Sequence, residues 1–248
     1  SKSLFCFIIK LPSLTSSKEP ANKPAMPDFL KFFLEEKLLG NKSLIFFQSK
    51  RLPKKNILPL NGIPLLTRVI RVAKKSSIFD EIIVSTEDEE ISNIAKKEDI
   101  TIHNRSTKLA SDYATVTDAC IEVLSKRQAD VFCCIYATAA LISVKSLRQS
   151  SKKFLSDKSA NVLMGVSKYN FHPVQALSLS KNGIAKMIFP NFEKIKSQKY
   201  PITRVSNGTF YWARFKNFLK EKTFYSKKLR LFDVPENETC DIDTLADY

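Results

Sequence analysis

Histidine, cysteine and glycine are scarce in this chain of 248 residues, and each shortage excludes a class of site. Two histidines, His103 and His172, are too few for chemistry that needs a histidine cluster. Five cysteines without C-x-x-C spacing predict neither a disulfide framework nor a zinc site, which favours a reducing cytoplasm. Five glycines leave no G-x-x-x-x-G-K-S/T and no G-x-G-x-x-G, so a phosphate site must be built without these glycine-rich loops.

Long apolar runs are lacking as well. No stretch approaches the ~20 residues that a membrane-spanning helix needs, and the apolar run at residues 4–9 is too short for a signal-peptide core. The composition, with 44% hydrophobic and 26% charged residues, is that of an ordinary globular protein. We therefore expect a soluble cytoplasmic protein that makes no membrane contact.

Acidic residues are in the minority, because 40 lysines and arginines face 25 acidic residues and leave a net charge of +15. A surplus of this size attracts polyanions, which include nucleic acid, anionic membranes and phosphorylated small molecules. The alternative is that the lysines only solvate the surface. Since lysine is spread along the whole chain and not gathered in a tail, we expect no nucleic-acid partner.

The chain divides into an N-terminal appendage, residues 1–40, and a regular domain, residues 41–248. Residues 13–27 are rich in Ser, Pro, Lys and Ala, a composition that cannot form a packed core by itself. In the domain, strand-like runs alternate with amphipathic stretches, which predicts a parallel sheet covered on both faces. The expected strands are 43–47, 81–85, 100–103, 131–136 and 161–167, and the expected helices are 64–75, 113–126, 143–155 and one that opens at a capping box in residues 86–89.

Beyond Phe171 the pattern becomes β-rich, with strand-like runs at 174–180, 184–188, 209–213 and 229–234. These runs predict either a mixed extension of the sheet or a separate lobe on the substrate side. The predicted fold class is therefore α/β, with a mostly parallel sheet and a smaller β-rich extension.

The loop after the first expected strand is the first candidate site, because open parallel sheets bind ligands at the carboxyl ends of their strands. Residues 48–56 bring together four cations, a hydroxyl and an amide side chain, and Pro53 stiffens the turn. Such a loop attracts a triphosphate by charge, and its main-chain N–H groups add hydrogen bonds. A solvated basic turn explains the same composition, so both interpretations stay open.

An acidic pair, Asp241 and Asp243, is the second candidate. In an extended chain these two carboxylates lie on the same side, because side chains alternate with a period of two. Mg²⁺ suits such a pair near phosphates, since it keeps several waters and takes few protein ligands. Surface acids or a helix N-cap are the alternatives. Together, the basic loop and the acidic pair predict one site in which the loop holds phosphate oxygens and the pair holds a metal.

Three further segments carry polar or aromatic side chains near strand ends. Residues 84–90 are explained by their capping role. In residues 105–115, Arg105 and several hydroxyls precede a helix, whose N-terminus could hold an anion or a base edge; alternatively Ser111 or Asp112 only caps it. Residues 207–212 end in three aromatics, for which buried core is favoured over a ligand wall.

Five motifs follow one another along the domain in a recognisable order. They are Ser-Lys-Arg-Leu-Pro-Lys-Lys-Asn (49–56), Leu-Asn-Gly-Ile-Pro-Leu (60–65), Phe-Asp-Glu-Ile-Ile-Val-Ser-Thr (79–86), Arg105 with Leu-Ala-Ser-Asp (109–112), and Asp-Ile-Asp-Thr (241–244). The set resembles the acylneuraminate cytidylyltransferases, the CMP-sugar-acid synthetases, over about residues 43–248. Residues 135–139 and 208–212 are more similar to the pseudaminic acid branch than to the sialic acid branch.

The resemblance implies a three-layer Rossmann-like nucleotidyltransferase, usually a homodimer, with Mg²⁺ as its cofactor. It implies transfer of CMP from CTP to the anomeric hydroxyl of a nine-carbon sugar acid, by in-line attack on the α-phosphorus with release of pyrophosphate. The implied catalytic residues are Lys55, Asp241 and Asp243, and the two aspartates are the implied metal ligands. The implied nucleotide-binding residues are Ser49, Lys50, Lys55, Asn56, Arg105 and Ser111, and the implied sugar-acid residues are Tyr136, Gln175, Ser197, Gln198 and Phe210.

The first loop departs from the family pattern, which usually has Ala-Arg-Gly-Gly before Ser-Lys. Here Phe46 replaces the arginine, and Phe47 and Gln48 replace the glycines that permit close backbone approach. Three hypotheses therefore stay open. They are an enzyme of the pseudaminic acid type, a cytidylyltransferase for another sugar acid such as 3-deoxy-manno-octulosonate, and a catalytically impaired or polyanion-binding protein of the same fold.

Overall fold

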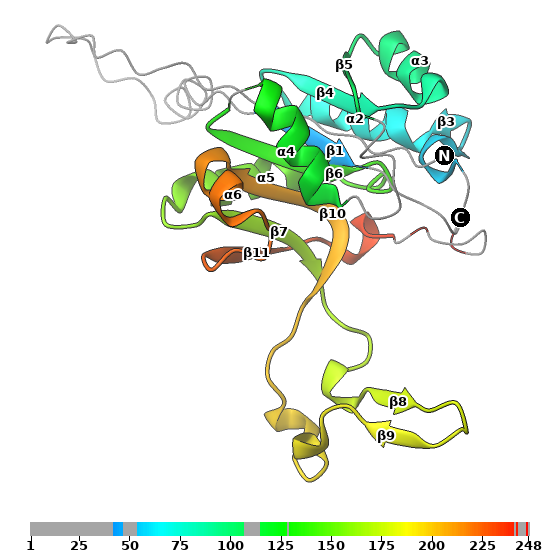
Figure 1. Ribbon diagram of the computed structural model, residues 1–248, viewed down its shortest axis with the longest axis vertical. Coiled ribbons are helices and arrows are strands. Elements are labelled where there is room, and N and C mark those ends of the chain that lie inside the picture. The colour runs from blue at the N-terminus through cyan, green and yellow to red at the C-terminus, as the bar shows by residue number, and fades with distance from the viewer. Residues whose placement is uncertain are drawn as a thin grey trace, which may run out of the picture.

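A seven-stranded sheet forms the centre of the chain (Figure 1). The computed structural model describes residues 54–106, 115–127, 129–240, 242 and 247, together with the main chain of residues 42–46. In spatial order the strands are β11 (Leu229–Asp233), β7 (Val162–Ser167), β10 (Val205–Arg214), β6 (Val131–Tyr136), β1 (Lys42–Phe46), β4 (Ile82–Thr86) and β5 (Thr101–Asn104). Of these seven, β10 runs antiparallel to both neighbours and the other pairs are parallel, so the sheet is mixed but mostly parallel.

Helices lie against both faces of this sheet. Helices α4 and α6 lie in front of the sheet in Figure 1, and α2 and α5, which contact each other, lie behind it. No helix among the described residues is long and apolar enough to cross a membrane. The helices are α2 (Leu65–Ser76), α3 (Glu89–Lys97), α4 (Val116–Lys126), α5 (Val144–Ser156) and α6 (Phe215–Glu221).

Strands β6 and β7 form the core because they are buried on both faces, and their sequences are correspondingly apolar throughout. Trp212 of β10 is fully buried between aromatic rings, with the Phe79 ring 5.6 Å and the Phe154 ring 6.4 Å from its centroid. Its indole N–H donates to the Ser150 hydroxyl at 3.0 Å, so the one polar atom of the ring is satisfied. The α5 helix is therefore fixed to the sheet by packing and by a hydrogen bond.

The strands expected between residues 43 and 167 are confirmed, and so are the helices expected at 64–75 and 143–155. Two details of the helix starts were wrong. The hydroxyl of Thr86 accepts the Asp88 N–H at 2.8 Å, but the N-cap of α3 is Asp88, whose side chain accepts the Ile91 N–H. The helix expected from residue 113 begins at Val116, and its capping box is formed by Thr115 and Asp118 and not by Ser111 or Asp112.

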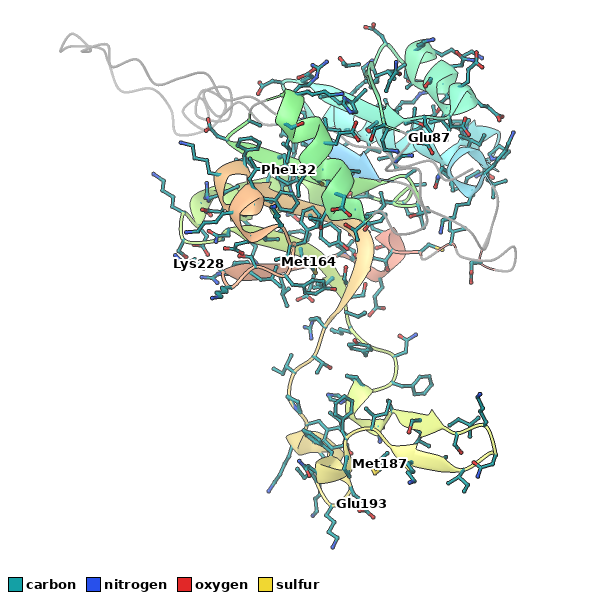
Figure 2. All side chains as sticks on the ribbon, viewed as in Figure 1. Glu87, Phe132, Met164, Met187, Glu193 and Lys228 are labelled. Carbon is teal, nitrogen blue, oxygen red and sulfur yellow. The ribbon has the colours of Figure 1, made fainter. Side chains whose placement is uncertain are left out.

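The β-rich half of the chain contains both of the arrangements that the sequence left open. Strands β10 and β11 extend the sheet, whereas β8 (Leu177–Leu179) and β9 (Ala185–Met187) form a hairpin in a separate arm, residues 168–204. Figure 1 shows this arm projecting away from the sheet, and Figure 2 places Met187 and Glu193 within it. Helix α6 was not predicted. The N-terminal appendage, residues 1–40, lies outside the described residues.

The aromatic packing around Trp212 predicts a large cost for truncating Phe154. Replacing Phe154, which is fully buried, with Ala should lower the free energy of unfolding by about 3–5 kcal/mol, because a cavity forms beside the indole. The lone tryptophan reports urea unfolding by its fluorescence. Tyr225→Ala is the control, since this ring is 72% exposed, and it should change the stability by less than about 0.5 kcal/mol. Equal effects of the two variants would contradict the described core.

Candidate functional site

The candidate site lies at the carboxyl ends of the parallel strands, around β1. The chain runs from β1 to β4 and β5 on one side of the sheet and places β6 on the other side, so the strand order reverses between β1 and β6. Open α/β sheets bind ligands at such a switch point. Because neighbouring strands lie about 4.8 Å apart, the ends of β6, β1, β4 and β5 together span about 14 Å.

Lys55 connects this edge to the C-terminal segment. It begins the short 3-10 helix η1 (Lys55–Ile57) after β1 and is only 6% exposed. Its ammonium group donates a 2.6 Å hydrogen bond to the main-chain carbonyl of Ile242, which stands between Asp241 and Asp243 in the sequence. A buried ammonium needs such oxygen partners to offset the loss of water. Lys55, near the end of the basic loop, and Ile242, in the middle of the aspartate motif, are therefore in contact although 187 residues separate them.

The C-terminal segment crosses the carboxyl edge and is fixed by three contacts, one to a strand and two to segments that follow strands. After β11, the Val234 N–H donates to the Val166 carbonyl on β7 at 3.0 Å. The Glu238 carboxylate at the end of η6 (Glu236–Glu238) accepts the Ser143 N–H, at the start of α5, at 2.9 Å. The contact of Ile242 with Lys55 follows. The segment thus passes from β7 past the α5 N-terminus, which follows β6, to the loop after β1.

Asn56 is the second buried polar residue of η1. It is 5% exposed, and its side-chain oxygen has no hydrogen-bond partner among the described residues. A buried acceptor left unsatisfied costs about 1–3 kcal/mol, so such an atom is typical of a site that a ligand completes. After η1 the strands β2 (Pro59–Leu60) and β3 (Ile63–Pro64) form a hairpin that turns at Asn61 and Gly62, both with positive φ.

Arg105 follows β5 directly and is held by the neighbouring strand. Its main-chain N–H donates to the Thr86 carbonyl at 3.2 Å, and its side chain, which is completely buried, forms an ion pair with Glu87. Next to this pair is a pocket of about 560 Å³, lined by Thr86, Glu87, Glu89, Ser92, Lys96, Ile102, Asn104 and Arg105. The pocket opens at the ends of β4 and β5, beside the loop that the sequence assigned to the nucleotide.

A second carboxylate fixes the residue after Arg105. Glu122 on α4 accepts the main-chain N–H of Ser106 at 3.1 Å and its hydroxyl at 3.2 Å. The same carboxylate lies 3.4 Å from the buried imidazole of His103. Burial lowers the pKa of His103 below its usual value despite this acidic neighbour, so the ring is held mainly neutral at pH 7. The start of the 105–115 segment is therefore anchored on both sides.

Tyr136 ends β6 and pairs in register with Phe46 at the end of β1. Burial raises the pKa of its phenol well above the usual value, so the group stays protonated and able to donate a hydrogen bond. Its ring contacts Tyr211 edge to face at 5.8 Å, and the Tyr211 hydroxyl lies 2.7 Å from the Ser206 hydroxyl. Tyr136 thus stands at the switch point itself.

A second pocket, of about 480 Å³, lies at the carboxyl end of β7. The C-terminal segment forms one wall, and Cys240, the residue before Asp241, is part of it. The pocket is therefore next to the aspartate motif in the sequence and on the same edge of the sheet. Its lining residues are Ser167, Lys168, Tyr169, Asn170, Val205, Ser206, Asn207, Glu236, Thr239 and Cys240.

The structure brings Lys55, Asn56, Arg105 and Tyr136 to one edge of the sheet. It does not bring the expected sugar-acid residues Gln175, Ser197 and Gln198 there, because all three are exposed and lie in the arm, in η3 (Pro173–Gln175) and η5 (Ser197–Lys199). Phe210 is fully buried against Phe232, so in one chain its ring belongs to the core. Ser49, Lys50, Ser111, Asp241 and Asp243 lie outside the described residues, as do Phe47 and Gln48 and the side chain of Phe46.

Sequence reasoning missed the second pocket and the carboxylate that pairs with Arg105. Lys168 and Asn170 follow β7 at its carboxyl end, so the rule that selected the first loop could have found them. Glu87 also follows a strand, β4, but it stands in a run of acids whose helix-capping role is a sufficient explanation of the sequence.

Comparison with known proteins gives concordant results. The family model for cytidylyltransferases matches residues 47–228. A pseudaminic acid cytidylyltransferase of Campylobacter jejuni (strain 81-176) is 35% identical over 205 residues, which cover 80% of this chain and 88% of that protein. The CMP-N,N'-diacetyllegionaminic acid synthase of Legionella pneumophila is 31% identical, covering 81% of this chain and 88% of the synthase.

A solved structure agrees at the level of the fold. A CMP:2-keto-3-deoxy-manno-octonic acid synthetase complexed with CTP superposes with a TM-score of 0.60 at 18% identity, covering 80% of this chain and 90% of the synthetase. At that identity the likeness concerns the arrangement of helices and strands alone. Taken with the family match over most of its length, it shows that the chain belongs to the cytidylyltransferase family of CTP-dependent enzymes.

Proposed function

We propose that this chain transfers CMP from CTP to the anomeric hydroxyl of a nonulosonic acid, pseudaminic acid in the first place, and releases pyrophosphate. The observation that carries the proposal is the hydrogen bond from Lys55 to the carbonyl of Ile242, since it joins the basic loop to the aspartate motif. The similarity to a pseudaminic acid cytidylyltransferase supports this choice of acceptor over 3-deoxy-manno-octulosonate.

In this proposal the edge of the sheet divides into a phosphate side and a base side. Ser49, Lys50 and Lys55 bind the triphosphate, while Asn56, Arg105 and Ser111 bind the nucleoside. The acceptor hydroxyl gives its proton to solvent and attacks the α-phosphorus, the bond from that phosphorus to the bridging oxygen breaks, and the electron pair leaves with pyrophosphate. The buried Lys55 ammonium sits where it can neutralise charge on the leaving group.

Asp241 and Asp243 are the proposed ligands of Mg²⁺. Two carboxylates offer the hard oxygen donors that Mg²⁺ prefers, and Ile242 between them is held at the candidate site by Lys55, so the donor set fits the ion. When bound, the metal supplies positive charge beside the phosphates. The protein's own part is to hold that motif at the ends of the strands, through Val234, Glu238 and Ile242.

The pocket at the end of β7 is the proposed acceptor site. It offers a cation, Lys168, for the sugar carboxylate, and amides and hydroxyls such as Asn170, Ser206 and Asn207 for the sugar hydroxyls and acyl groups. Tyr136, protonated at the neighbouring switch point, adds a donor. The pocket and the aspartate motif are consecutive along the chain, so an acceptor bound there reaches the α-phosphorus.

We propose a homodimer because the arm carries many exposed apolar side chains. Large apolar side chains that a monomer leaves in water are concentrated there, among them Phe171, Leu177, Leu179 and Ile202 with 62–91% exposure. A second copy would cover them. In such a dimer the arm of one chain can approach the edge of its partner, which would give Gln175, Ser197 and Gln198 a place near a sugar acid.

Two broader assignments belong to the same proposal. The mostly parallel sheet with helices on both faces supports a three-layer, Rossmann-like nucleotidyltransferase fold. A cytoplasmic location is supported by Cys120, Cys133 and Cys134, which are buried and form no disulfide within the described part of the chain.

Release of pyrophosphate in the presence of CTP and Mg²⁺ tests the reaction. We expect release with pseudaminic acid and little with legionaminic, N-acetylneuraminic or 3-deoxy-manno-octulosonic acid, and we expect EDTA to abolish it. Silence across the whole panel would contradict the proposal and would indicate that Phe46, Phe47 and Gln48 exclude the triphosphate.

Two adjacent lysines provide a matched test of the phosphate side. Lys55→Met should lower kcat/KM at least about a hundredfold, because the buried ammonium is lost and the Ile242 carbonyl loses its donor. Lys54→Met is the control, since its side chain is 65% exposed and pairs with Glu90 at the surface. Steady-state kinetics on both variants, with thermal melting to verify folding, should separate them. Comparable kinetics would contradict the assigned role of Lys55.

The arm predicts the oligomeric state. We expect light scattering to give the mass of a dimer, and Leu179→Asp, at a side chain 74% exposed on β8, to give a monomer. Leu231→Asp on β11, where the side chain is 41% exposed, is the control and should remain dimeric. A monomer for the control alone would place the interface at the edge of the sheet and overturn the arm proposal.

A further inference from the structure

An ion pair is buried in the wall of the pocket at the ends of β4 and β5. The Arg105 side chain is 0% exposed and that of its partner, Glu87, is 17% exposed. Both residues line the pocket, and Figure 2 places Glu87 at the top of the sheet, at the opposite end from Lys228 before β11. Buried ion pairs contribute little net stability, because both charges lose water. Because stability does not explain a buried ion pair in a pocket wall, we expect this pair to take part in ligand binding.

Glu87 is held on both sides along the chain. It follows Thr86, the last residue of β4, and precedes Asp88, the N-cap of α3. The Thr86 hydroxyl accepts the Asp88 N–H at 2.8 Å, and the Asp88 carboxylate accepts the Ile91 N–H at 3.1 Å. Because the main chain is fixed before and after Glu87, its carboxylate is presented to Arg105 from a rigid position.

We propose that Glu87 is a positioning residue that orients the Arg105 guanidinium toward the base of CTP and away from its phosphates. The inference rests on the proposed function, in which Arg105 binds the nucleotide. An Arg–carboxylate pair has no net charge, so it attracts a triphosphate weakly, but its planar N–H groups still donate to a neutral base edge. Because Glu87 neutralises its charge, Arg105 is suited to recognise the base and not the phosphates.

The same geometry predicts selection of cytosine over uracil. Cytosine presents acceptors at O2 and N3, whereas N3 of uracil carries a hydrogen. Guanidinium donors fixed for the cytosine pattern would meet a donor on uracil, and the hydrogen bond would be lost. A good bidentate contact discriminates against the wrong base by about tenfold to a hundredfold.

Glu87→Gln tests the inference with three probes, CTP, UTP and inorganic tripolyphosphate, each titrated calorimetrically with Mg²⁺. We expect CTP to bind about tenfold to a hundredfold more weakly than in the unaltered protein. Tripolyphosphate and UTP should change by less than about threefold. Glu98→Gln is the matched control, because Glu98 is 16% exposed and pairs with Arg71 at 2.8 Å on α2, away from the pocket; it should bind all three probes as before.

Three outcomes would overturn the inference. Equal losses for CTP and tripolyphosphate would mean that Arg105 contacts phosphate, and E87Q binding that matches E98Q would mean that Glu87 positions nothing. An unaltered protein that binds tripolyphosphate but does not prefer CTP to UTP would overturn the proposed function, and this inference with it.

The E87Q variant buries the Arg105 charge without the Glu87 carboxylate, and this could prevent folding. In that case a double-mutant cycle still tests the inference. The E87Q/R105Q double variant buries neither charge at this position, and Arg105→Gln leaves the Glu87 carboxylate, which is 17% exposed and in contact with the pocket. If Glu87 acts only through Arg105, the two should bind CTP within about twofold of each other. A further tenfold loss in the double variant would show that Glu87 acts on the ligand directly, which contradicts a positioning role.

Discussion

The hydrogen bond from the buried ammonium of Lys55 to the carbonyl of Ile242 is the constraint on which the candidate site depends. It closes the loop after the first strand onto the last segment of the chain, and so joins the proposed phosphate-binding loop to the segment that carries the proposed metal ligands. The contacts at Val166 and Ser143 lead the C-terminal segment along that edge before it reaches Lys55. The contact between Lys55 and Ile242 lies next to β1, where the strand order of the sheet reverses, and open α/β sheets bind ligands at such a switch point.

The two cationic side chains at this edge, Lys55 and Arg105, have different kinds of partner. On the proposed phosphate side the Lys55 ammonium donates to the neutral carbonyl of Ile242. On the proposed base side the Arg105 guanidinium forms an ion pair with Glu87, a combination that we propose suits an uncharged partner. A nucleotide has both parts, phosphates and a base, and the Asn56 side-chain oxygen, which has no hydrogen-bond partner among the described residues, lies on η1 next to Lys55.

The alternation of elements could be predicted from the sequence because β6 and β7 are buried on both faces and are apolar at nearly every position. Helix α6 could not, because it has seven residues and Arg214 at its N-cap makes no side-chain capping bond. The start of α3 was misplaced for a related reason. Thr86 does accept a main-chain N–H, but two residues ahead in a turn, and Asp88 takes the capping position.

The candidate site, like the fold, could be predicted from the sequence only in part. Lys55, Asn56 and Arg105 lie in segments that the sequence marks by their position after strands, whereas Tyr136 was implied only by the resemblance to the family; the structure brings all four to one edge of the sheet. Gln175 and Ser197, which the resemblance to the family implied for the sugar acid, lie in the arm, and the sequence could not place them because a β-rich pattern does not distinguish an arm from a lobe over the sheet. The Glu87–Arg105 pair depends on two strands meeting side by side, which the spacing of residues along the chain does not encode.

A crystal structure with Mg²⁺ and α,β-methylene-CTP, which cannot release pyrophosphate, tests most directly whether this edge holds the nucleotide. We expect the phosphates within hydrogen-bonding distance of the Lys55 ammonium, the metal at Asp241 and Asp243, and the cytosine against Arg105. A nucleotide bound in the arm, or at the opposite edge of the sheet near Lys228, would contradict the closure through Ile242 as the basis of the site.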